Sequence, residues 1–133
     1  MEQPVPRTAD LEAARRYHMA LRQIFIRHTG EVADRRALRR ALALCNAIDA
    51  SAGDAYCREK LRVVREYAAE MLDGTDHAKW SRDRLSGIEF LRQQVLNALE
   101  LLASRLYSLE ALQRANARSG APQWTTLSSI ARI

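Results

Sequence analysis

The sequence predicts an all-α fold, a four-helix bundle-like single domain with a long C-terminal helix and a short tail. Between Pro6 and Pro122 the chain contains no proline, and glycine occurs only five times in 133 residues, so residues that break helices are rare. Alanine, leucine, arginine and glutamate, which favour helix, are abundant. Apolar side chains recur at spacings of three and four, which is the period of an amphipathic helix.

Local signals divide the chain into a series of helices. Thr8 is a suitable N-cap for the first helix, and Thr29 and Gly30 are a stop signal at its end. The connection around Asp54, which can cap the third helix, is so short that the second and third helices should form an antiparallel hairpin. Ser81 is a natural N-cap for the last helix. The predicted segments are an arm over residues 1–7, helices over 8–28, 31–50, 54–72 and 81–118, and a tail over 119–133.

The last helix is predicted to be much longer than the others. At about 1.5 Å per residue it would span ~57 Å, against ~30 Å for each of the first three helices. Three short helices cover only part of that length, yet the apolar stripe of the last helix continues beyond it. Monomers seldom leave such a patch of leucines exposed. The helix is therefore expected to pair with a second chain, to break and fold back, or to be covered by the tail with Trp124.

Self-association is the preferred solution, because residues 81–118 contain no proline and their one glycine, Gly87, is close to the start. The predicted dimer or partner seam consists of Leu99, Leu102, Leu106, Leu109 and Trp124. The high arginine and alanine content is typical of GC-rich bacteria. We therefore expect a non-catalytic bacterial protein-interaction or regulatory module, which acts as a homo-oligomer (a dimer) or with another protein.

Nucleic acid is an alternative partner, because the formal charge is +5 and the pI is about 9.8. The arginines that would contact phosphates on the second helix are Arg35, Arg36, Arg39 and Arg40. The first helix adds further arginines, Arg27 among them. No Asn, Gln, Ser or Thr lies between the four arginines, so the pattern does not indicate base reading. The competing interpretation is an ordinary solvated helix face.

A second alternative is an anion-binding site or a small helical enzyme with an arginine-lined site. Arg92 interrupts the apolar stripe of the last helix. An arginine on a buried face needs an anionic partner or a ligand, unless it reaches the surface or pairs with a glutamate. Catalysis is the less favoured interpretation, because the sequence shows neither a Ser-His-Asp arrangement nor a glycine-rich phosphate loop.

No cofactor or metal is expected, because the chain has no Cys-x-x-Cys motif and no pair of histidines at helical spacing. Cys45 and Cys57 are expected to pack as reduced, small apolar residues. His18 lies on the apolar stripe of the first helix and is expected to be buried with a hydrogen-bond partner. The chain has no stretch of ~20 apolar residues and no signal peptide at its start, so a cytoplasmic location without membrane contact is expected.

Overall fold

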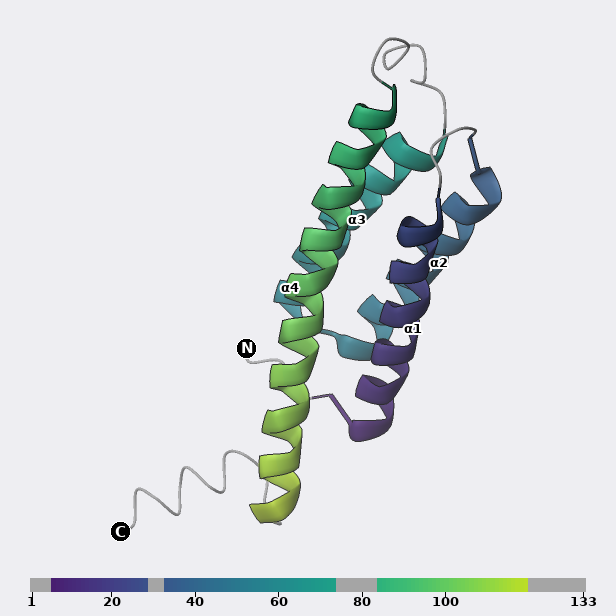
Figure 1. The fold of residues 1–133 in the computed structure, drawn as a ribbon. Coiled ribbons are helices and arrows are strands. Elements are labelled where there is room, and N and C mark those ends of the chain that lie inside the picture. The colour runs from purple at the N-terminus through teal and green to yellow at the C-terminus, as the bar shows by residue number, and fades with distance from the viewer. Residues whose placement is uncertain (1–5, 29–32, 74–83, 120–133) are drawn as a thin grey trace.

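The structure is a computed structural model, and it describes residues 6–28, 33–73 and 84–119. These residues form four helices, α1 (Thr8–Arg27), α2 (Arg35–Ala52), α3 (Ala55–Asp73) and α4 (Arg84–Ser119). The helices run alternately up and down, each packs against the next along the chain, and α1 also packs against α4 (Figure 1). The predicted all-α bundle with a long last helix is confirmed. None of the described helices is both long enough and apolar enough to cross a membrane.

One helix start and one N-cap differ from those predicted. α2 begins at Arg35, later than expected, because Asp34 is its N-cap and its side chain accepts a hydrogen bond from the Ala37 backbone N–H at 2.9 Å. α1 already includes Thr8, and the preceding Arg7 makes no side-chain cap bond, so the prediction of Thr8 as a cap was wrong. The predicted signals at residues 29–30 and 81 lie outside the described residues.

The turn between α2 and α3 is as short as predicted. Gly53 ends α2 with a φ of 57°, in the left-handed region that glycine adopts without steric cost. Asp54 then caps α3, because its carboxylate accepts the Cys57 backbone N–H at 3.1 Å. The same carboxylate accepts two bonds from Arg105 of α4, at 2.9 and 3.0 Å, which hold the pKa of Asp54 below its usual value. The predicted cap and hairpin are confirmed, and the turn is tied to α4.

The leucines predicted to remain uncovered on the last helix are instead buried within the chain. α3 lies against the first part of α4, as far as the contact between Asp54 and Arg105. α1 lies further along α4, where Arg15 pairs with Glu110 at 3.3 Å. The two helices are therefore staggered and together cover more of α4 than either does alone. All four leucines of the predicted seam are at 5% exposure or less, namely Leu99, Leu102, Leu106 and Leu109.

His18 and the two cysteines have the buried positions that the sequence predicts. The Nε2 atom of His18 lies 2.7 Å from the Leu99 carbonyl oxygen of α4, so this nitrogen carries the proton and donates it to the carbonyl. Cys45 and Cys57 are free thiols inside the core. Burial raises the pKa of Cys45 to about 11 and that of Cys57 to about 12, so both stay protonated and pack as apolar groups.

The position of His18 predicts a loss of stability in mild acid. Burial lowers the pKa of His18, so the folded chain resists a proton that the unfolded chain takes up near pH ~6.5. We expect no contribution from this group above that pH and a falling free energy of unfolding below it. The H18Q variant keeps an N–H for the Leu99 carbonyl and cannot be protonated, so it should show a flatter pH dependence. Urea unfolding at pH 7.5 and 5.5 measures this, and an equal loss in both proteins would contradict it.

Candidate functional site

The end of α1 and the start of α2 form a cleft at one end of the bundle. α1 ends at Arg27, and the His28 backbone N–H still donates to the Ile24 carbonyl. The backbone N–H of Asp34, the N-cap of α2, donates to the Leu72 carbonyl of α3 at 2.8 Å. This bond joins the start of α2 to the end of α3, so the bundle itself holds one wall of the cleft in place.

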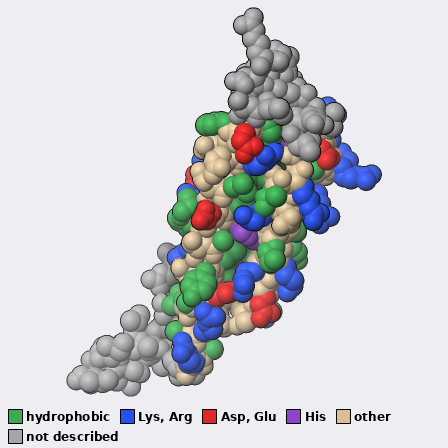
Figure 2. All heavy atoms as spheres, in the orientation of Figure 1, with side chains coloured by type: hydrophobic (Ala, Val, Ile, Leu, Met, Phe, Trp, Pro, Cys, Tyr) green, Lys and Arg blue, Asp and Glu red, His purple; other side chains and the backbone are tan. Residues whose placement is uncertain are grey.

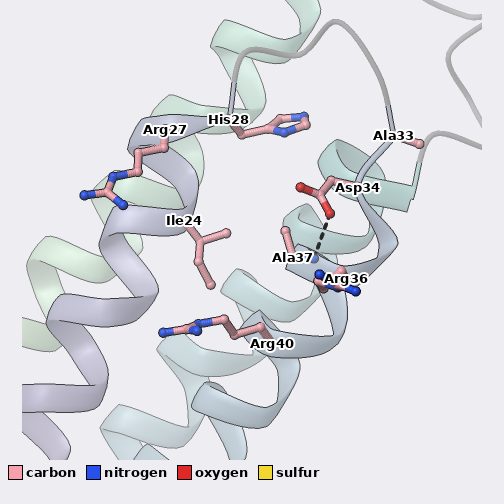
Figure 3. A pocket seen from close by; sticks show the side chains of 8 residues that line it. All are labelled: Ile24, Arg27, His28, Ala33, Asp34, Arg36, Ala37 and Arg40. Carbon is pink, nitrogen blue, oxygen red and sulfur yellow. Dashed lines mark hydrogen bonds between the residues drawn. The ribbon is translucent and has the colours of Figure 1, made fainter.

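The cleft has a volume of about 390 Å³, which is in the range of small-ligand sites, ~300–1,000 Å³. We call it the basic cleft, and its lining residues are Ile24, Arg27, His28, Ala33, Asp34, Arg36, Ala37 and Arg40. In Figure 3, Arg40 extends from α2 toward α1 and His28 extends from the end of α1 toward α2. Arg27 lies at the rim and points outward. Two helices therefore contribute arginines to one cleft.

The arginines of the basic cleft have no acidic partner. Among the described residues, no carboxylate lies within ion-pair distance of Arg27, Arg36 or Arg40, and all three side chains are exposed. The acidic lining residue, Asp34, is already occupied as the cap that accepts the Ala37 N–H. The first turn of α2 adds the positive end of its helix dipole. The basic cleft therefore has an uncompensated positive charge, which favours an anion.

Many arginines elsewhere in the described part of the chain pair with carboxylates, although Arg22, Arg114 and Arg118 do not. Examples are the pairs Arg58–Asp49, Arg62–Glu59 and Arg105–Asp54, with nitrogen–oxygen distances of 3.3, 2.6 and 2.9 Å. By contrast, two more exposed arginines without a carboxylate partner extend the basic surface, Arg16 on α1 and Arg39 on α2. Arg16 precedes Arg27 by 11 residues, or about three helical turns, so both lie on one side of α1. Figure 2 shows Lys and Arg side chains along the edge formed by α1 and α2.

The structure separates the four arginines predicted on the second helix. Arg36 and Arg40 line the basic cleft, and Arg39 is exposed nearby on α2. Arg35 is directed elsewhere, because its Nε lies 3.6 Å from the Asp73 carboxylate at the end of α3. Arg27, one of the further arginines that the sequence places on the first helix, joins the site because an antiparallel connection brings the last turn of α1 beside the first turn of α2. The sequence signal for its position was the short connection between the first two helices, which places the end of one beside the start of the next.

Arg92 has a structural role that the sequence did not reveal. Its Nε donates to the Phe25 carbonyl at 3.0 Å, and its Nη2 donates to the His28 carbonyl. Its Nη1 pairs with Glu89, and the side chain is only 18% exposed. Carbonyl groups in the last turn of a helix lack partners inside that helix, so Arg92 completes the C-terminal end of α1. It does not line the basic cleft, and its pair with Glu89 is the glutamate alternative that the sequence left open.

Trp124, the remaining residue of the predicted seam, lies outside the described residues. Within the described ranges, no three His, Cys, Asp or Glu side chains gather as a metal ion would require. Comparison of the chain with protein-family models, curated proteins and solved structures finds no match. The function is therefore inferred from the geometry and the charge of the site.

Proposed function

We propose that this chain is a non-catalytic binding module that holds the phosphate backbone of a nucleic acid at the surface around the basic cleft. One observation carries the proposal: Arg27, Arg36 and Arg40 line one cleft from two helices, and none of them pairs with a carboxylate. Exposed arginines without a carboxylate partner keep their donors for an external anion. Guanidinium groups form paired, charge-assisted hydrogen bonds with phosphate oxygens.

A polymer fits this surface better than a single small anion. Arg16 and Arg39 continue the unpaired charge beyond the basic cleft, along both helices. A free phosphate or a mononucleotide would occupy the cleft and leave these two arginines unused. A nucleic acid repeats its phosphates along its length and can reach several of the arginines at once.

The proposed binding has little sequence preference. Phosphate contacts position a protein on nucleic acid, whereas base reading requires donors and acceptors aimed at base edges. Between Arg36 and Arg39 the chain offers only Ala37 and Leu38, so α2 has no amide or hydroxyl group among its arginines. We therefore expect similar affinity for oligonucleotides of different sequence.

A salt titration with matched variants tests the proposal. The R27A/R36A/R40A variant removes three unpaired arginines, and the control R7A/R58A/R62A removes three that pair with carboxylates. Both lower the formal charge of +5 by the same amount. If the cleft arginines each neutralise one phosphate, the slope of log K against log salt should fall by ~2.7 in the first variant, at ~0.9 per contact. The control should lose much less.

Fluorescence anisotropy with a labelled oligonucleotide, between 50 and 300 mM salt, measures this slope. Equal losses in the two variants would mean that net charge alone attracts the oligonucleotide, and the basic cleft would not be the site. If inorganic phosphate stabilised the wild type against heat and no oligonucleotide bound, the ligand of the basic cleft would be a small anion and not a nucleic acid.

A further inference from the structure

The outer side of α4 has an unusual surface that the basic cleft does not explain. We define the outer strip as Phe90, Asn97, Leu101, Ser104, Ser108 and Leu112, which lie on the side of α4 opposite its core residues. Its three large apolar side chains are well exposed, Phe90 at 58%, Leu101 at 46% and Leu112 at 39%. Buried leucines such as Leu99 and Leu102 lie on the opposite side of the same helix.

The outer strip contains no charged residue, because Arg92, Glu100, Arg105 and Glu110, which lie between Phe90 and Leu112 in the sequence, are on other sides of α4. Its neighbours Gln93, Gln94 and Ala111 are also uncharged, and charge begins only at its edges, with Glu100 and Arg105. The exposed sides of the other helices are typical solvent faces, with Arg36 and Arg39 on α2 and Arg62 and Glu66 on α3. Charged residues are depleted in the cores of protein interfaces. The outer strip therefore has the composition of an interface rather than of a solvated helix face.

Two polar side chains at the outer strip already form hydrogen bonds within α4. The Gln93 side-chain amide donates to the Asn97 side-chain oxygen at 3.1 Å. The Ser108 hydroxyl donates to the Ser104 backbone carbonyl, also at 3.1 Å. A partner can cover these groups without breaking their hydrogen bonds, so the desolvation that usually opposes the burial of polar residues is reduced.

The spacing of the apolar residues along the outer strip indicates what kind of partner fits it. Phe90, Leu101 and Leu112 are separated by 11 residues each, which is about three helical turns or ~16.5 Å. In an antiparallel pair of α4 helices related by a two-fold axis at Leu101, the two Leu101 side chains meet at the centre. Phe90 of each copy then faces Leu112 of the other. We infer that a second copy of this chain docks on the outer strip in this antiparallel arrangement.

A two-fold interface uses the same patch on both subunits, so the patch must be self-complementary. The outer strip meets this condition because it is uncharged and because its apolar residues are evenly spaced about Leu101. The absence of charge also argues against nucleic acid at this surface, because phosphates need cationic contacts. The interface is separate from the basic cleft: α2 packs on α1 and α3 and lies diagonally across the bundle from α4.

The size of the outer strip indicates a weak dimer. From Phe90 to Leu112 it is ~33 Å long, and a helix is ~10 Å wide, which makes a footprint of roughly 330 Å² per chain. Stable interfaces of standard size bury about 800 Å² per partner. We therefore expect a dissociation constant in the micromolar range and a monomer at low micromolar concentration.

Sedimentation velocity of the full chain, at concentrations from 2 to 500 µM, tests the dimer. The wild type should shift from monomer to dimer over this range. The L101E variant, which puts two carboxylates at the two-fold axis, should weaken the dimer more than tenfold. The control Y107E makes the same kind of change at another exposed position of α4, where Tyr107 is 67% exposed beside α1, and should dimerise as the wild type does.

A wild type that stays monomeric at 500 µM would overturn the inference, and so would an unchanged dimer in L101E. Far-UV circular dichroism checks that L101E is folded, as expected for a change at a side chain that is 46% exposed.

Cysteine cross-linking tests the orientation. L101C should form a disulfide with its own copy, and F90C should cross-link to L112C and not to itself. Strong F90C self-cross-linking would indicate a parallel pair and contradict the arrangement. The native thiols are buried and do not compete.

Discussion

Replacing Leu99 by alanine is expected to destabilise the fold by about 2–5 kcal/mol, the range for large-to-small changes in a close-packed core. Leu99 is fully buried, and its backbone carbonyl accepts the hydrogen bond from His18 of α1. Removal of its side chain leaves a cavity where α4 packs on its neighbours. A loss of this size is a large fraction of the total stability of a small domain.

Leu101 provides the matched control, because it lies two positions away on the same helix and is 46% exposed. The L101A variant should change the free energy of unfolding by about 0.5 kcal/mol or less, as is usual for surface positions. Urea unfolding at 2 µM protein, followed by far-UV circular dichroism, separates this effect from self-association. If L99A left the unfolding curve unchanged and altered only the oligomeric state, Leu99 would belong to the seam that the sequence predicts and not to the core.

Leu99 and Leu101 differ in burial although they are two positions apart, and the helical pattern of the sequence did not predict which of them is exposed. Periodicity predicts the four helices, and Asp54 predicts the hairpin turn, because both depend on residues close together in the chain. What covers each side of α4 depends on how far α1 and α3 slide along it. That stagger arises from contacts such as Arg15–Glu110 and Asp54–Arg105, between residues far apart in the sequence. The apolar character of the last helix was therefore predictable from the sequence, whereas the prediction of which leucines remain uncovered was wrong.

The same limit applies to the arginines of the candidate site. Arg35 and Arg36 are neighbours in the chain, yet Arg35 pairs with Asp73 and Arg36 lines the basic cleft without a carboxylate partner. Which arginine is neutralised depends on the end of α3, and no local pattern contains that information. The basic character of the second helix was predictable from the sequence, whereas the contribution of Arg27 required the packing of α1 against α2.

Replacing Arg92 by methionine is expected to destabilise the fold by about 2–6 kcal/mol, since two carbonyls lose a partner, and to weaken anion binding at the basic cleft. Methionine keeps much of the apolar stem but donates no hydrogen bond, so the Phe25 and His28 carbonyls lose the partner that Arg92 provides. A part-buried carbonyl left without a partner costs about 1–3 kcal/mol. His28 also lines the basic cleft, and Arg27 lies directly before it, so a frayed end of α1 displaces two lining residues.

The R92K variant separates charge from geometry. Lysine keeps the positive charge, but its single ammonium group does not reproduce the planar fork that contacts both carbonyls and Glu89. We expect R92K to lose an intermediate amount of stability and to bind oligonucleotide more weakly than the wild type at equal salt. Urea unfolding and the anisotropy titration measure the two effects. If R92M lost stability and retained full oligonucleotide affinity, binding would not depend on the end of α1, and the site would have to lie on α2 alone.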